Sequence, residues 1–132
     1  MHSQLTLNSK DDKKEARKKN QQWEPYVNNQ GSVLGFIGNG YIMLAADTRI
    51  SVGYSILSRE AQKIFQLSDK IFIASSGMYA DMIALVKNMK VRVELYKASN
   101  KFEPGVENIA QLLANTLYSK RFFPYYAFVL LA

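Results

Sequence analysis

Short apolar runs followed by two longer helical stripes dominate the pattern of this chain. Val33 to Ile37 and Tyr41 to Ala46 flank Gly38-Asn39-Gly40, a triplet that tolerates positive φ and suits a tight hairpin turn. The run 41–46 lacks polar alternation, which is typical of a strand covered on both faces. The pattern therefore predicts a hairpin whose second strand lies inside a layered fold.

Two further β-type runs, Gln62 to Leu67 and Ile71 to Ser75, flank the polar turn Ser68-Asp69-Lys70 and predict a second hairpin. Residues 50–60, between the two hairpins, are polar and irregular, so we expect a loop with one short extended piece there. On this interpretation four strands precede the first helix.

Two amphipathic helices and a last strand complete the predicted order. Between Tyr79 and about Ala98, apolar residues recur at steps of three and four, which predicts a helix with one core-facing side. Pro104 suits the first turn of a second helix that ends before Pro124, and the two helices should pack side by side. Residues 125–131 form another β-prone run, so the fold class is α+β.

Charge divides the chain into two parts. Residues 1–22 contain five lysines and one arginine without apolar periodicity, and we expect a disordered or loosely helical basic extension. Residues 23–132 then form the folded domain, and the total of 132 residues with 48% hydrophobic content suits one core. The basic run lacks the aromatic residues that stack on bases, which argues against nucleic acid as a partner.

Several kinds of site are excluded by composition. The chain has no cysteine, and its one histidine, His2, follows the first methionine, so we predict no metal site and no cofactor. Its apolar stretches are shorter than the ~20 residues that a bilayer span requires, and the N-terminus lacks a signal-peptide pattern. We expect a soluble intracellular protein without a membrane partner.

Asp47-Thr48-Arg49 ends the predicted strand 41–46 abruptly. A carboxylate buried alone costs several kcal/mol, so Asp47 needs either a charged partner or a solvated pocket. Lys63 lies sixteen residues after Asp47, and Gly31 lies sixteen residues before it. The triplet is therefore a structural corner or part of a site.

The run LAADTR, followed at this spacing by Lys63 in SREAQKIFQL, resembles the β-type subunits of the 20S proteasome. Active members of that family begin with a threonine that supplies the nucleophilic hydroxyl and the base, beside an aspartate and a lysine. The matching position here is Gly31, so the resemblance implies a non-catalytic subunit without a catalytic residue. Gly77 falls where the family uses a backbone N–H to stabilise an oxyanion. The vestigial positions are then Gly31, Asp47, Arg49, Lys63 and Gly77.

Two aromatic motifs, Trp23-Glu24-Pro25-Tyr26 and Arg121-Phe122-Phe123-Pro124-Tyr125-Tyr126, resemble the non-catalytic sixth β subunit of that family. The resemblance implies an N-terminal nucleophile hydrolase-type four-layer α/β/β/α sandwich, of which this chain holds the first half, truncated at the C-terminus. It also implies assembly with α-type and β-type subunits in stacked seven-membered rings. The implied role is ATP- and ubiquitin-dependent protein degradation in the cytoplasm and nucleus.

Two alternative functions stay open from the sequence. Gly31-Ser32 imitates the glycine-threonine bond that active members cut, and Ser32 could then serve as the nucleophile of an active hydrolase. Its spacing to Asp47 and Lys63 is one residue short in each case, and a shift by one residue turns a strand side chain to the opposite face. We therefore expect Ser32 to point away. The second alternative is a basic-tailed interaction domain that binds nucleic acid.

Overall fold

The computed structural model describes residues 23–132, so the predicted basic extension 1–22 lies outside the described part. Seven strands and two helices form within residues 23–132. The strands are β1 (Val33–Ile37), β2 (Ile42–Ala46), β3 (Ile50–Val52), β4 (Ser55–Ser58), β5 (Ile64–Ser68), β6 (Ile71–Gly77) and β7 (Ala127–Leu131). The helices are α2 (Tyr79–Asn100) and α3 (Val106–Tyr118).

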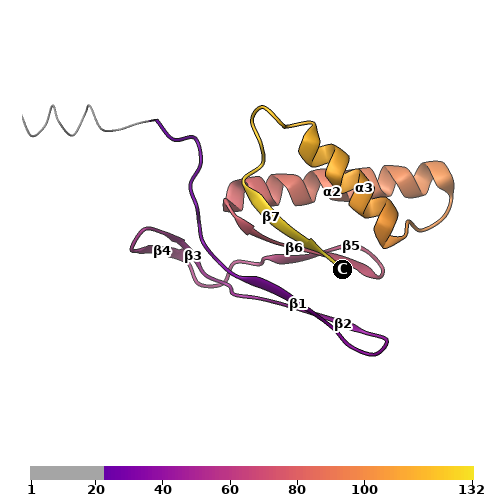
Figure 1. Ribbon diagram of the computed structural model, residues 1–132, viewed down its shortest axis with the longest axis horizontal. Helices are drawn as coiled ribbons and strands as arrows, with labels where there is room; N and C mark the ends of the chain where they lie inside the picture. The colour runs from indigo at the N-terminus through magenta and orange to yellow at the C-terminus, as the bar shows by residue number, and fades with distance from the viewer. Residues whose placement is uncertain (1–22) are drawn as a thin grey trace, which may run out of the picture.

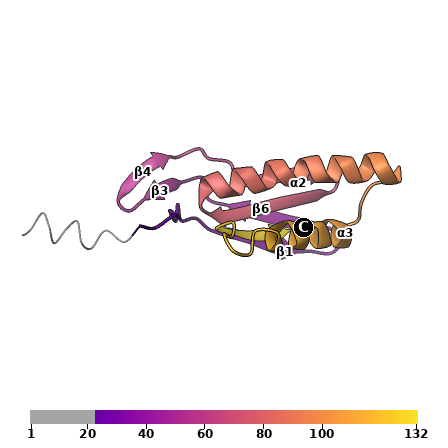
Figure 2. The same cartoon turned by 90° about the horizontal axis from the view of Figure 1, so that it is seen from above.

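Three layers build the body of the fold. Strands β5, β6 and β7 form an antiparallel sheet with β6 in the centre. Helices α2 and α3 lie side by side over one face of this sheet, and the antiparallel β1–β2 hairpin lies along its other face (Figures 1 and 2). At the contact between the two sheets, Gly35 of β1 lies against the side chains of Leu44 and Leu130.

The core lies between the helices and the three-stranded sheet, as the helical stripes predict. Its fully buried side chains come from both layers and include Ile73, Leu85, Met89, Val93 and Ile109. The predicted helix from Tyr79 and the helix after Pro104 are both confirmed, and α2 continues to Asn100. Helix α2 ends where Lys101 adopts the left-handed conformation and its N–H bonds to the carbonyl of Lys97.

The prediction of a loop at residues 50–60 was wrong. This region forms the β3–β4 hairpin, with a turn at Gly53-Tyr54 and a bulge between Ile50 and Ser51. Gly53 adopts a φ of +56°, which a glycine accepts without strain, and this allows so short a turn in a polar segment. Six strands, not four, therefore precede α2 within residues 23–132.

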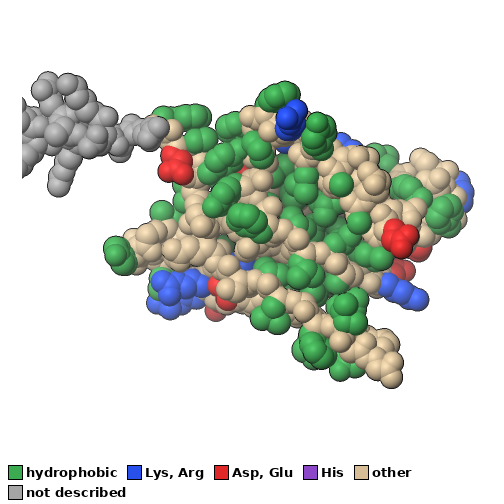
Figure 3. All heavy atoms as spheres, viewed as in Figure 1, with side chains coloured by type: hydrophobic (Ala, Val, Ile, Leu, Met, Phe, Trp, Pro, Cys, Tyr) green, Lys and Arg blue, Asp and Glu red, His purple; other side chains and the backbone are tan. Residues whose placement is uncertain are grey.

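The expected cover on both faces of the second strand is present on one face only within the described residues. Cross-strand pairs place Leu34, Phe36 and Met43 on the face of the β1–β2 hairpin that points away from β5–β6–β7. These side chains are 57%, 59% and 57% exposed. Figure 3 shows hydrophobic side chains gathered along this hairpin. An unbroken apolar run indicates that both faces of a strand need apolar neighbours, but it does not identify the segment that provides them.

We expect this exposed hairpin face to drive self-association of the 132-residue chain at micromolar concentration, because contiguous exposed apolar surface and unpaired strand edges both promote association. Phe36→Lys should shift sedimentation profiles toward monomer and lower the fluorescence of a bound hydrophobic dye. Val91→Lys, at a 60% exposed position on α2, is the control that should change neither. A monomeric, dye-free unmodified chain would contradict the expectation.

Candidate functional site

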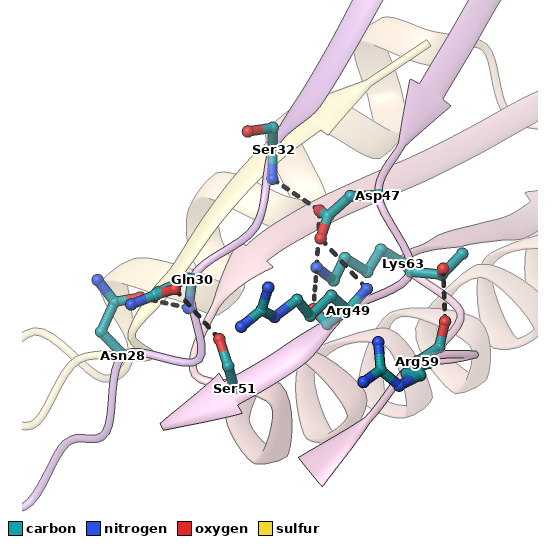
Figure 4. A network of polar contacts seen from close by, with 9 residues as sticks. Asn28, Gln30, Ser32, Asp47, Arg49, Ser51, Arg59 and Lys63 are labelled. Atoms are coloured by element: carbon teal, nitrogen blue, oxygen red, sulfur yellow. Dashed lines mark hydrogen bonds and ion pairs between the residues drawn. The ribbon is translucent and has the colours of Figure 1, made fainter. Parts of the chain in front are cut away.

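A partly buried ion pair between Lys63 and Asp47 forms the centre of the site (Figure 4). Asp47 directly follows β2, and Lys63 directly precedes β5. The Lys63 Nζ donates to Asp47 Oδ1 at 2.8 Å and to the carbonyl oxygen of Arg49 at 2.7 Å. The lysine side chain is 1% exposed and the aspartate side chain 39% exposed, so the carboxylate is the member of the pair that reaches solvent.

The Asp47 carboxylate accepts two further hydrogen bonds from the backbone. The amide of Ser32 donates to Oδ1 at 2.8 Å, and the amide of Arg49 donates to Oδ2 at 3.2 Å. Burial alone raises the pKa of Asp47, but the hydrogen bond and charge of Lys63, together with these two amides, outweigh burial and hold the pKa below the usual carboxyl value. The charged Asp47 carboxylate therefore links the residue before β1 to the β2–β3 connection through hydrogen bonds.

Gly31 lies directly beside this ion pair. Its φ is +110°, a conformation that side chains rarely adopt. A β-carbon added to Gly31 would overlap Lys63 Nζ and lie 3.0 Å from Asp47 Oδ1. The ammonium group thus occupies the space that a side chain at position 31 would need, and the carboxylate limits any movement of that ammonium.

The other predicted positions contribute through the backbone. Arg49 gives its amide and carbonyl to the Asp47–Lys63 pair, whereas its guanidinium makes no hydrogen bond or ion pair to a described residue. Ser32 gives its amide, and its hydroxyl points away from the pair, as the strand register predicts (Figure 4). Gly77 ends β6, where an added β-carbon would lie 2.5 Å from the carbonyl oxygen of Tyr126. The lack of a side chain at Gly77 therefore allows β7 to approach.

Sequence reasoning missed a second set of polar residues next to the site. Asn29 is buried, and its backbone and side chain bond to Ser51, Gly77 and Tyr79. The hydroxyl of Ser51 donates to Gln30 Oε1 at 3.1 Å (Figure 4). The only signal in the sequence is that amide side chains precede a strand, which also occurs in ordinary turns.

The arrangement can hold charge but offers no nucleophile at the centre of the pair. Position 31 has no side chain, and the Ser32 hydroxyl faces elsewhere. Among residues 23–132, no group of three His, Cys, Asp or Glu side chains lies close enough together to hold a metal ion. Neither α2 nor α3, the two helices of that range, combines the length and apolar character that crossing a bilayer requires.

Residues 27–132 match the protein family described as proteasome subunit, and the chain belongs to that family. Its curated relatives include a proteasome subunit beta type-1 of Arabidopsis thaliana, 49% identical over 84% of this chain and 50% of the relative. A proteasome subunit beta type-1 of Dictyostelium discoideum is 49% identical over 83% of this chain and 47% of the relative. A probable proteasome subunit beta type-6 of Schizosaccharomyces pombe is 37% identical over 84% and 49%.

These comparisons bear out the resemblance to β-type proteasome subunits drawn from LAADTR and Lys63. The chain spans about half the length of the curated relatives that it matches. The mixture of strands and helices agrees with an α+β fold in this family.

Proposed function

We propose that this chain is a non-catalytic, structural β subunit of the 20S proteasome core. One observation supports the proposal: Lys63 Nζ, bonded to Asp47, fills the space that a side chain at Gly31 would take. By resemblance, Gly31 matches the position of the family's nucleophile. In an active site, the ammonium would lie beside a hydroxyl. Here its hydrogen bonds go to Asp47 and to the carbonyl oxygen of Arg49, so they stabilise the fold.

The layer order supports the same proposal at the level of the fold. Helices, a three-stranded sheet and the β1–β2 hairpin follow one another in space, as expected for part of a four-layer α/β/β/α sandwich of the N-terminal nucleophile hydrolase type. The exposed outer face of β1–β2 is then the place for the remaining layer. The motifs at 23–26 and 121–126 favour the sixth β subunit as the counterpart.

In this proposal the subunit works through contacts, as part of seven-membered β rings stacked against α rings. It contributes wall and ring interfaces, and neighbouring subunits carry out ATP- and ubiquitin-dependent protein degradation in the cytoplasm and nucleus. The particle's assembly is therefore the property to test first. Co-expression with a set of partner β-type and α-type subunits should recover the chain in a ring-sized complex, and recovery only as free chain would contradict the proposal.

We expect this chain to show no peptidase activity and no covalent adduct with an electrophile that traps N-terminal threonine, because position 31 offers no hydroxyl. Intact mass spectrometry of the assembled particle measures this directly. Adducts on the catalytic subunits of the same particle are the internal control. Stoichiometric labelling of Ser32, or a chain that begins at Ser32, would instead support the active hydrolase that the sequence left open.

A further inference from the structure

The connection between α3 and β7 presents aromatic and basic side chains to solvent. It arches away from the ends of both elements (Figure 1), and a basic side chain lies there between hydrophobic ones (Figure 3). The side chain of Phe122 is 95% exposed, and that of Tyr118, the last residue of α3, is 69% exposed. A single exposed hydrophobic residue is ordinary at a protein surface, whereas neighbouring ones mark interaction sites.

Arg121 joins the two exposed rings into one group. Its Cζ lies 5.9 Å from the ring centroid of Tyr118 and 5.6 Å from that of Phe122, within the range of cation–π attraction. We refer to Tyr118, Arg121 and Phe122 as the aromatic–basic cluster. The Lys120 Nζ lies next to it, 5.9 Å from the ring centroid of Tyr125.

The positive charge of this group has no local compensation. Neither Lys120 nor Arg121 forms an ion pair with any residue in the range 23–132. Residues 108–132 contain no aspartate or glutamate. The Asp81 carboxylate reaches the connection from α2, but it accepts a hydrogen bond from the amide of Tyr126 at 2.9 Å. The cluster therefore attracts carboxylates that the described part of the chain does not supply.

The backbone that carries the cluster is held in place from both sides. The amide of Arg121 donates to the carbonyl of Tyr118 at 3.0 Å, which continues the helical turn beyond α3. On the other side, the ring of Tyr26 stacks on Phe123 at a centroid distance of 5.4 Å, and its hydroxyl donates to the carbonyl oxygen of Pro124 at 2.6 Å. Groups that are ordered before binding lose less conformational entropy on binding, so the cluster is a preorganised anchor.

We propose that the aromatic–basic cluster inserts into an apolar pocket, rimmed by carboxylates, on a neighbouring proteasome subunit. Aromatic residues and arginine dominate the centres of protein interfaces, and an anchor that projects from a surface requires a concave partner. Carboxylates at the rim complement the charge of Lys120 and Arg121. A nucleic acid would instead require a longer row of cations than the two that this connection offers. The inference rests on the proposed function and adds the chemistry of one contact.

Competitive assembly tests the anchor. The unmodified chain and Phe122→Ala, with different tags, are co-expressed with partner β-type and α-type subunits, and Phe122→Ala should be at least about tenfold less abundant in the ring-sized complex. Phe102→Ala removes the same side chain from a 57% exposed position on the α2–α3 connection and should enter as the unmodified chain does. Arg121→Glu should also be depleted, and this depletion should shrink as salt is raised. Since the Phe122 side chain is exposed, Phe122→Ala should keep the unmodified urea midpoint.

A photoreactive benzoylphenylalanine in place of Phe122 identifies the partner without truncating the anchor. In the assembled particle it should crosslink to one neighbouring subunit, at a site that contains aspartate or glutamate. Crosslinks only within its own chain, or a nucleic-acid affinity that Phe122→Ala abolishes, would overturn the inference. Equal abundance of Phe122→Ala and the unmodified chain in the complex would overturn it alone and leave the proposed function intact. An unmodified chain recovered only in free form would contradict both.

Discussion

Gly31→Ala should destabilise the fold by more than about 3 kcal/mol, because two separate costs add at this position. A non-glycine residue held at positive φ costs roughly 1–3 kcal/mol. The added β-carbon also overlaps Lys63 Nζ, and the ammonium can move only by leaving Asp47 Oδ1 and the Arg49 carbonyl. Displacing the ammonium adds about 2 kcal/mol, less than removing one partner of a fully buried pair, because the Asp47 side chain is 39% exposed. Urea unfolding in a Phe36→Lys background, followed by circular dichroism, measures the difference.

Gly53→Ala is the matched control, because Gly53 also has positive φ but an added β-carbon there meets no atom within 4 Å. It should cost about 1–2 kcal/mol, the backbone term alone. In a Lys63→Ala background, Gly31→Ala should fall to a similar value, which gives a coupling energy of about 2 kcal/mol in a double-mutant cycle. Equal costs for Gly31→Ala and Gly53→Ala would show that the ammonium moves freely. The same overlap explains why threonine at position 31 alone should not create a working nucleophile.

The elements that the sequence predicts well are those set by local periodicity. Met82, Leu85, Val86, Met89 and Val93 recur at helical spacing, and that spacing alone places them on the buried face of α2. The glycine-containing turn 38–40 similarly fixes the β1–β2 hairpin, because Gly40 has a φ of +79°, which few other residues accept. The spacing between Asp47 and Lys63 identifies the ion pair only through family resemblance, since sixteen residues have no structural meaning by themselves.

The features that the sequence could not predict depend on contacts between distant segments. The β3–β4 hairpin forms in a serine-containing stretch whose polar composition favours a loop, and pairing across Gly53 overrides that preference. Asn29 caps a helix that begins fifty residues later, so no local motif reveals it. The overlap between Lys63 and a side chain at position 31 likewise exists only in three dimensions.

Asp47→Ala should destabilise the chain by about 3 kcal/mol at pH 7, because it leaves the Lys63 ammonium buried with the Arg49 carbonyl as its remaining partner. We take the lower end of the range for broken buried pairs, since Asp47 is 39% exposed and solvent screens the interaction. Asp47→Asn keeps the shape of the side chain and one hydrogen-bond acceptor, so it should lower the free energy of unfolding by less. Lys63→Met removes both the charge and its desolvation cost, and should be the mildest of the three.

Acidification should remove the same stabilisation in the unmodified chain. The folded-state pKa of Asp47 lies below the unfolded value, so the folded chain resists protonation at this carboxyl. The contribution is complete above the unfolded carboxyl pKa, about 3.9, and is lost as the pH falls through the lower folded pKa.

Glu103 also has a lowered pKa, because it accepts hydrogen bonds from Lys97 and Ser68, and Glu103→Gln measures that share of the acid dependence. Between pH 6 and pH 3, the unfolding free energy of Asp47→Ala should therefore fall less than that of the unmodified chain. Parallel curves for the two chains would show that Asp47 carries no charge-dependent stability, and the ion pair would then be a consequence of the fold that does not stabilise it.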